Sequence, residues 1–462
     1  MRTALPRSFA VALATLALAG TCAAQSAPVA AAASAPATRP VPVTLFQDVR
    51  VYDGKGSTLS GPANVLVRGN RIERVSSAPI ATDPSFVVIA GNGRTLMPGL
   101  IDSHWHTIFA SPSMFELIEG DIGYLTLLAS AEAKATLMRG FTTVRDLGGP
   151  SFALKRAIDE GVVVGPRIYP SGAMITITGG HGDFRSPAEL PRSIGGPTTH
   201  MERLNGSQLA DSPDEVRLRV REQLLLGASQ IKLTAGGGVA SPHSPLDVST
   251  FTEEELRAAV QAAANWGTYV GVHAYTPEAI QRAIVAGVKV IEHGHLMDDA
   301  TARMIAEKGI WLSFQPFSDD GPMAPMPPSS VARMRQIFEG TDRTVALARK
   351  YKIRMAWGTD ILFSAANATR QGAKLAKMAQ WYSPAEALAM ATSANGELLQ
   401  LSGPRNPYPG KLGVVEEGAL ADLLLVEGNP LENIKLIEDP ARNFVVIMKD
   451  GTIYKNLVGA GK

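Results

Sequence analysis

The chain has a single cysteine, Cys22, among its 462 residues. One thiol excludes an internal disulfide, a CxxC zinc site and an iron–sulfur cluster held by this chain alone. Charge of one sign is also lacking, because 44 Lys and Arg stand against 43 Asp and Glu, which gives no electrostatic footprint for nucleic acid or anionic lipid. With 45% hydrophobic residues, the composition is typical of a folded, non-membrane protein. Any bound metal must therefore be held by His, Asp, Glu or a less usual ligand.

The start of the chain resembles an export signal. Two arginines precede an apolar run over 8–19, and small residues at 22–24 follow where a signal peptidase would cut. We therefore expect a signal peptide over 1–24 and a periplasmic or secreted mature protein, with no membrane attachment. Lipidation at Cys22 is the less favoured alternative, because the residue before it suits lipidation poorly. The Ala/Pro/Ser-rich stretch 25–42 is expected to be a flexible linker.

Both ends of the remaining chain carry short strand patterns separated by Gly, Pro and Asn turns. These runs are 44–52, 63–68, 71–75, 86–90, 421–426, 443–449 and 452–454. Strands at both ends predict a small β-sandwich domain, formed by residues 43–96 and 402–462. The long middle, 97–401, would then be inserted between them.

The middle of the chain alternates short apolar runs with helix patterns. The eight runs are 95–101, 141–146, 167–173, 230–234, 269–273, 288–292, 311–315 and 354–359. Helices are expected over 214–226, 252–266, 277–286, 299–308, 331–350 and 384–399, the second opening with a capping-box pattern. This alternation predicts an α/β fold with a (β/α)8 TIM barrel. A doubly wound sheet is the rival, but no GxGxxG follows the first strand.

Histidines gather where the predicted strands end. His104 and His106 close the first strand, and alternation of side chains along a strand puts both imidazoles on one face. His273 ends the fifth strand, His293 and His295 end the sixth, and Asp360 ends the eighth. Functional residues of such barrels lie at the C-terminal ends of the strands, so these side chains should converge. Convergence of imidazoles and a carboxylate predicts a metal site.

Lys232 lies inside the apolar fourth strand, where an unpaired ammonium is costly to bury. One interpretation is structural: the stem packs while the charged end reaches solvent, or the amine pairs with a buried acid. The other is chemical: the lysine loses its charge by reacting with CO2. The resulting carbamate has two oxygens and could bridge two metal ions.

The chain resembles the amidohydrolase superfamily, in the imidazolonepropionase-like branch that includes Xaa-Pro dipeptidases and ochratoxin-degrading amidohydrolases. The resemblance covers nearly all of residues 43–455. Its motifs are 97–106, 179–183, 231–232, 273–275, 291–294, 358–360 and 418–423. It implies two divalent ions, with zinc favoured because imidazole and carboxylate ligands suit it.

The resemblance also implies a role for each ligand. His104, His106 and Asp360 would hold the more buried ion, and His273 and His293 the second. Carboxylated Lys232 would bridge the two ions. His293 is preferred to His295 because it lies in a Glu-His-Gly context, and the roles of His295 and His243 stay open.

The chemistry implied is amide hydrolysis by metal-activated hydroxide. Asp360 would take the water proton and pass it to the leaving nitrogen. His181 could bind the developing oxyanion or the substrate, and Tyr275 could bind a substrate carboxylate; plain structural roles are the alternatives for both.

The expected substrate is a small-molecule amide, either a dipeptide or an N-acyl amino acid, cleaved in a carboxypeptidase- or prolidase-like reaction. Ochratoxin A is included, because several apolar residues near the strand ends suit a bulky group: Trp105, Phe109, Phe184, Phe314, Phe317 and Phe363. Alternatives are hydrolysis of a cyclic amide or lactone and, from another class, an exported binding protein with an inactive site. The family resemblance implies a homo-oligomer, with an octamer as one form.

Overall fold

The computed structural model describes residues 41–241, 243–318 and 326–458. The predicted signal peptide, 1–24, and linker residues 25–40 lie outside this range, so both stay predictions. Among the described residues, none of the helices combines the length and apolar character needed to cross a membrane.

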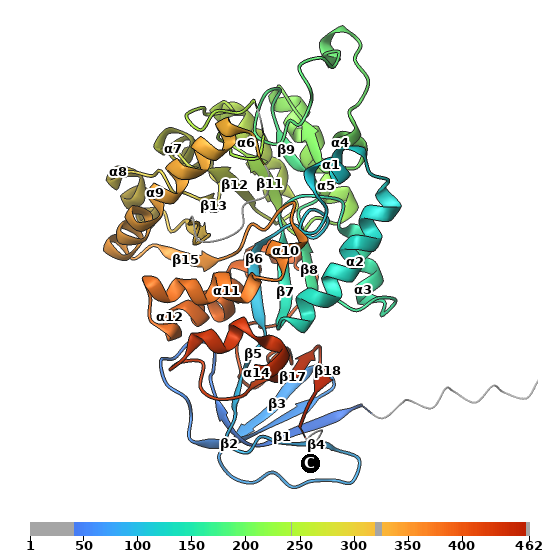
Figure 1. Cartoon of the computed structure of the whole chain (residues 1–462), viewed down its shortest axis with the longest axis vertical. Coiled ribbons are helices and arrows are strands. Elements are labelled where there is room, and N and C mark those ends of the chain that lie inside the picture. The colour runs from blue at the N-terminus through green and yellow to red at the C-terminus, as the bar shows by residue number, and fades with distance from the viewer. Residues whose placement is uncertain (1–40, 242, 319–325, 459–462) are drawn as a thin grey trace, which may run out of the picture. The chain divides into compact units, whose positions relative to one another are not determined.

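The two chain ends form one mixed sheet, as their strand patterns predicted. Its strands are β1 (Val43–Val51), β2 (Pro62–Arg68), β3 (Arg71–Ser76), β4 (Val87–Ala90), β5 (Thr95–Pro98), β16 (Leu423–Val426), β17 (Phe444–Lys449) and β18 (Thr452–Asn456). The order β18-β17-β16-β5-β1-β2-β3 places the red C-terminal strands beside the blue N-terminal ones (Figure 1).

A sandwich would have two separate sheets, and here the hydrogen bonds form one. The reason is β1, which pairs with β2 along one edge and with β4 and then β5 along the other. A register shift between Phe46 and Val49 marks a β-bulge in this strand, and bulges bend the strand that carries them. One long strand therefore joins what would otherwise be two layers.

All eight strands predicted for the middle of the chain are present and pair in parallel. They are β6 (Leu100–Trp105), β7 (Phe141–Asp146), β8 (Arg167–Pro170), β11 (Ile231–Thr234), β12 (Val270–Ala274), β13 (Val290–His293), β14 (Trp311–Phe314) and β15 (Arg354–Trp357). Two short strands, β9 (Met174–Thr176) and β10 (Ser207–Leu209), are additional. Almost every residue of these strands is buried, as expected for parallel strands covered on both faces.

The predicted ring of strands is not closed by hydrogen bonds. Strands β6–β8 form a three-stranded sheet, and the other seven strands form a second sheet in the order β10-β9-β11-β12-β13-β14-β15. Between β6 and β15, the side chain of Asn395 makes hydrogen bonds that link the two strands in place of backbone pairing. Its amide donates to the carbonyls of Ile101 (2.7 Å) and Trp357 (2.8 Å), and its oxygen accepts from the Trp357 N–H.

The first run of the middle, predicted as one strand over 95–101, divides at Gly99. Residues before it belong to β5 in the chain-end sheet, and residues after it begin β6. A Cβ at Gly99 would lie 2.2 Å from Thr142 Oγ1, so only glycine allows the backbone to pass this point. The boundary between the two sheets therefore falls two residues later than the predicted 96/97 division.

Helices cover the parallel strands (Figure 1). They are α1 (Met114–Glu119), α2 (Ile122–Met138), α3 (Phe152–Asp159), α4 (His200–Arg203), α5 (Pro213–Leu226), α6 (Glu253–Asn265), α7 (Pro277–Ala286), α8 (Asp299–Glu307), α9 (Pro328–Tyr351), α10 (Ala365–Ala368), α11 (Gln371–Ala376), α12 (Pro384–Ala389), α13 (Asn395–Leu399) and α14 (Pro440–Asn443). The predicted capping box at Thr252 and Glu255 begins α6. The helix predicted over 384–399 is α12 and α13, joined by a π-helical turn at Met390–Ala394.

Candidate metal centre

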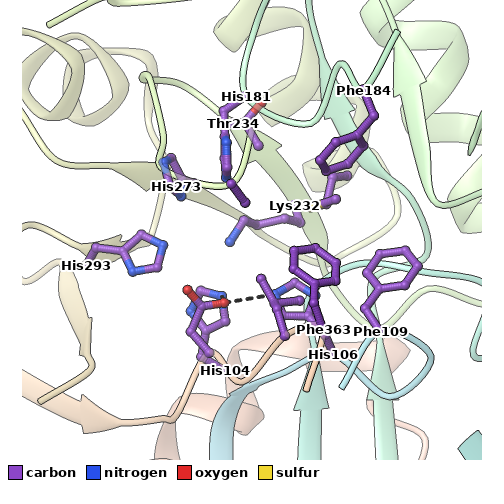
Figure 2. Close-up of a pocket in the computed structure, with 14 residues that line it drawn as sticks. His104, His106, Phe109, His181, Phe184, Lys232, Thr234, His273, His293 and Phe363 are labelled. Atoms are coloured by element: carbon purple, nitrogen blue, oxygen red, sulfur yellow. Dashed lines mark ion pairs between the residues drawn. The ribbon is translucent and has the colours of Figure 1, made fainter. Parts of the chain in front are cut away.

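Six predicted ligands face one cavity at the C-terminal ends of the parallel strands (Figure 2). They come from β6, β11, β12 and β13 and from the segments just after β6 and β15: His104, His106, Lys232, His273, His293 and Asp360. Together with eight further residues they line a cavity of about 30 Å³. About 10–15 Å³ of such space holds one water molecule, so the cavity has room for a few small ligands such as ions or waters.

Asp360 is the centre of the first ligand group. Its Oδ1 lies 3.3 Å from His104 Nε2 and 3.2 Å from His106 Nε2. Burial opposes ionisation, but the imidazoles of His104 and His106 hold the pKa of Asp360 well below its ordinary value. Ligand atoms of His104, His293 and Asp360 all lie within 4.8 Å of one another, so one cation could contact all three.

The backbone around Asp360 is strained and pinned. Asp360 has φ +50° and Phe363 has φ +59°, a region that L-residues occupy only when their surroundings hold them there. The Asp360 N–H donates to the His104 carbonyl (2.8 Å), and the Phe363 N–H donates to the Phe109 carbonyl (2.8 Å). The segment after β15 is thus fixed to the segment after β6, which sets Asp360 beside both histidines.

The carbonyl oxygen of Gly237 determines which ring nitrogen of His273 is free to bind a metal. His273 Nε2 lies 2.9 Å from the Gly237 carbonyl oxygen, which can only accept, so Nε2 carries the proton. Its Nδ1 therefore keeps the lone pair that a metal requires. The ring also lies 4.5 Å from that of His293, centre to centre. His273 and His293 are thus adjacent, as the resemblance implied for ligands of one ion.

Lys232 is buried and reaches into the space between His104, His181 and His293 (Figure 2). Burial lowers the pKa of its amine to about 8. No ion pair holds the amine in the residues that the structure describes. The buried carboxylates of Glu292 and Asp360 nevertheless attract the charged amine, so the acid-partner interpretation stands beside the chemical one. An amine with a lowered pKa is more readily neutral, which is the form that reacts with CO2.

The buried carboxylate of Glu292 lies beside His104, and its contacts bear on whether the site fits a cation. Burial would raise the pKa of Glu292, but Arg145 beside it lowers that pKa to about 2. Glu292 Oε2 lies 3.0 Å from His104 Nδ1, yet no donor within the described ranges completes a hydrogen bond to it. A proton on His104 Nδ1 would satisfy this oxygen and leave Nε2 as a ligand. The donor set therefore fits a divalent cation.

His181 and Tyr275 lie beside the second pair of histidines. The His181 ring stacks on that of His273 with centres 4.3 Å apart, and burial lowers the pKa of His181 to about 4. A neutral His181 lines the cavity and can donate one hydrogen bond into it. Tyr275 stacks on His293 with ring centres 4.8 Å apart, but it does not line the cavity.

The six apolar residues expected near the substrate separate into two groups. Phe109, Phe184 and Phe363 line the cavity, on the side of His106 (Figure 2). Trp105, Phe314 and Phe317 do not line it. Met174 and Leu362 also line it, and sequence patterns did not identify them.

The remaining histidines lie outside the ligand set. His243 is exposed, and His295 Nε2 is engaged with the Gln315 carbonyl at 2.9 Å. Gln315 itself was not anticipated from the sequence, although its side chain contacts two predicted ligands, His104 and His293. The available signal was a polar residue at the C-terminal end of the seventh apolar run.

Comparison with known proteins places these residues in a family. The model of the amidohydrolase family matches residues 95–460. Ochratoxinase of Aspergillus niger is 32% identical over 378 residues, which cover 78% of this chain and 75% of the ochratoxinase.

Solved structures of two peptidases are also similar to this chain. A prolidase complexed with N-methylphosphonate-L-proline is 34% identical with a TM-score of 0.83, and the match covers 90% of this chain and all of the prolidase. A Xaa-Pro dipeptidase with methionine bound in its active site is 29% identical with a TM-score of 0.77, covering 90% of this chain and all of the dipeptidase.

Proposed function

Because the chain belongs to the amidohydrolase family, hydrolases that act on carbon–nitrogen bonds, we propose that it cleaves dipeptides or N-acyl amino acids at a centre of two divalent ions. The observation that carries this proposal is the convergence of four imidazoles, a carboxylate and a buried lysine on one cavity. Similarity to a prolidase and a Xaa-Pro dipeptidase supports an amide with an amino acid as its leaving group.

The proposed ligand sets are those that the resemblance implied. His104, His106 and Asp360 would hold one ion, and His273 and His293 the other, with a carbamate on Lys232 between them. Zinc is the proposed metal, because imidazole and carboxylate donors suit it. When bound, such ions supply Lewis acidity that lowers the pKa of a shared water and polarises the scissile carbonyl.

The side chains around the cavity would transfer protons and bind the substrate. Asp360, held ionised by its neighbours, can accept the proton of the attacking water and return it to the leaving nitrogen. His181 is neutral near pH 7 and can donate a hydrogen bond to the substrate carbonyl or carboxylate. Tyr275 packs against both histidines of the second pair without lining the cavity, and we keep it as a proposed contact for a substrate carboxylate on the family resemblance.

The phenylalanines favour an apolar group beside the scissile bond. Phe109, Phe184 and Phe363 line the same side of the cavity, on the side of His106 (Figure 2). Apolar surface of this kind excludes charged side chains and gains free energy from burying large neutral ones. An aryl amide such as ochratoxin A fits this description, in line with the similarity to an ochratoxinase.

Lys232→Ala tests the enzyme against the alternative of an inactive binding protein. The proposal expects the variant to lose bound metal and turnover together, measured by elemental analysis and by hydrolysis of a panel of dipeptides and N-acyl amino acids. A binding protein would keep its ligand affinity in this variant. Hydrolysis confined to cyclic amides or lactones in the wild-type chain would replace the proposed substrate class.

Export and assembly belong to the same proposal. We expect cleavage after residue 24 and a periplasmic or secreted homo-oligomer. N-terminal sequencing of the mature protein and its mass in solution test these two points.

A further inference from the structure

Gln315 is a fully buried amide between two of the proposed metal ligands. It directly follows β14, and its side chain has no exposed surface. Its Oε1 lies 2.7 Å from His293 Nδ1, and its Nε2 lies 3.3 Å from His104 Nδ1. A single side chain therefore contacts ligands that come from different strands, β6 and β13.

The orientation of this amide is fixed by a third contact. Gln315 Nε2 lies 3.2 Å from the Ser313 carbonyl oxygen, which can only accept a hydrogen bond. The NH2 group must face Ser313, so Oε1 must face His293. His293 Nδ1 then has to carry the proton, and His293 Nε2 keeps the lone pair. Gln315 thus selects the tautomer of His293 that leaves Nε2 free for a cation.

The backbone of Gln315 is held by His295. His295 Nε2 donates to the Gln315 carbonyl at 2.9 Å. Its ring stacks with those of Phe314 and Phe317, with centres 5.0 and 5.2 Å away, and has no exposed surface. This arrangement gives His295 a supporting role behind the site.

We propose that Gln315 is a positioning residue that holds His293, and through it the second proposed ion. The inference rests on the proposed two-ion centre and adds a residue that no family motif quoted above contains. His104 Nδ1 has a second neighbour, Glu292 Oε2 at 3.0 Å, to which it can donate when Nε2 serves as a ligand. In that tautomer Nδ1 is a donor, so the carboxylate of Glu292 orients His104, whereas the NH2 group of Gln315 only lies beside it. Residues in such supporting positions typically contribute about 10- to 100-fold to metal affinity.

The test compares zinc binding to the full-length chain and its variants, measured by competition with a chelator and by elemental analysis. Gln315→Met keeps the volume and removes both polar atoms, whereas Gln315→Glu keeps an oxygen that accepts from His293. Gln223→Met is the matched control, because Gln223 is also a buried amide but lies on α5, where it bonds Ala173 and Asn205.

The proposal predicts that Gln315→Met weakens zinc binding by about 10- to 100-fold at the site that includes His293. Gln315→Glu should restore affinity toward the wild-type value, and Gln223→Met should keep wild-type affinity even if it lowers stability. The visible spectrum of the cobalt-loaded chain should change in Gln315→Met and not in Gln223→Met. If Gln315→Met fails to fold, Gln315→Asn, which draws the amide back from His293, should show the same loss of affinity.

Different results would contradict the positioning role of Gln315 and the proposed two-ion centre. Wild-type affinity and an unchanged cobalt spectrum in Gln315→Met would overturn the positioning role while leaving the two-ion centre intact. An equal loss in Gln223→Met would also overturn it, because the effect would then be a general loss of stability. A wild-type chain that binds no divalent ion would overturn both proposals.

Discussion

Asp360 Oδ1 lies between two imidazoles, 3.3 Å from His104 Nε2 and 3.2 Å from His106 Nε2. Asp360 lies more than 250 positions from both histidines in the sequence, and a backbone hydrogen bond from the Asp360 N–H to the His104 carbonyl joins the two segments. The proposed proton acceptor is therefore fixed to β6, which carries His104 and directly precedes His106.

Replacing Asp360 should abolish most of the activity without unfolding the chain. Asp360→Asn removes the proton acceptor, and general acid–base groups typically contribute about 10²- to 10⁴-fold to the rate. We expect kcat to fall by that order when each variant is assayed with its metal content determined in parallel. A variant with normal metal content and wild-type kcat would contradict the assigned role.

If Lys232 carries a carbamate, the turnover that the metal-free protein regains on adding metal should depend on bicarbonate. The neutral amine reacts with CO2, and its lowered pKa of about 8 favours that form more than an ordinary lysine would. After chelation, zinc added in CO2-free buffer should restore little turnover, and bicarbonate should restore the rest. Full recovery without bicarbonate would show that the lysine acts in another way.

Removal of one phenylalanine should change substrate preference and leave the metal in place. Burying a side chain of this size is worth about 1.5–3 kcal/mol, so Phe363→Ala should lower kcat/KM for amides with an aromatic group by about 10-fold or more. Small substrates should be affected less, and metal content should not change. Phe115→Ala is the control, because Phe115 is 74% exposed on α1. Equal losses for aromatic and small substrates would contradict the proposed apolar wall.

The stability of the protein should depend on pH through Asp146, a buried carboxyl at the end of β7. Burial raises the pKa of Asp146 from 3.8 to about 7, although Ser151 and Thr107 donate hydrogen bonds to it. A raised folded pKa gives stability that is fully present below pH 4 and is lost as the pH rises to about 7.

Urea unfolding of the wild type and Asp146→Asn at pH 5 and pH 8 measures this effect. The wild type should lose unfolding free energy relative to Asp146→Asn on going from pH 5 to pH 8. An unchanged difference between the two proteins would show that Asp146 does not titrate in this range.

The sequence predicted the strands and the ligands for related reasons. Parallel strands buried on both faces are short apolar runs, and a polar residue at the end of such a run, as at His273 or Asp360, is visible in a single sequence. The gap between β6 and β15 was not visible, because it depends on Asn395, which lies nearly 300 residues from Ile101. Gln315 was missed for a similar reason: its chemistry arises only from where its amide points.

Local backbone strain was equally hidden. His293 has φ +78° and Asp360 has φ +50°. Both residue types are enriched at positive φ, but most Asp and His residues have negative φ, so the sequence alone did not predict these turns. Both turns become favourable only when contacts from other strands hold them, as the His104 carbonyl holds Asp360. Sequence patterns therefore predicted which residues gather at the cavity, whereas the structure was needed to learn how they are oriented.

The most direct test of the account is a metal count on the purified chain, combined with hydrolysis of dipeptides and N-acyl amino acids before and after chelation. We predict two divalent ions per chain, hydrolysis that is lost on chelation, and recovery when zinc is added together with bicarbonate. Fewer than one ion per chain, together with no chelator-sensitive hydrolysis, would contradict it.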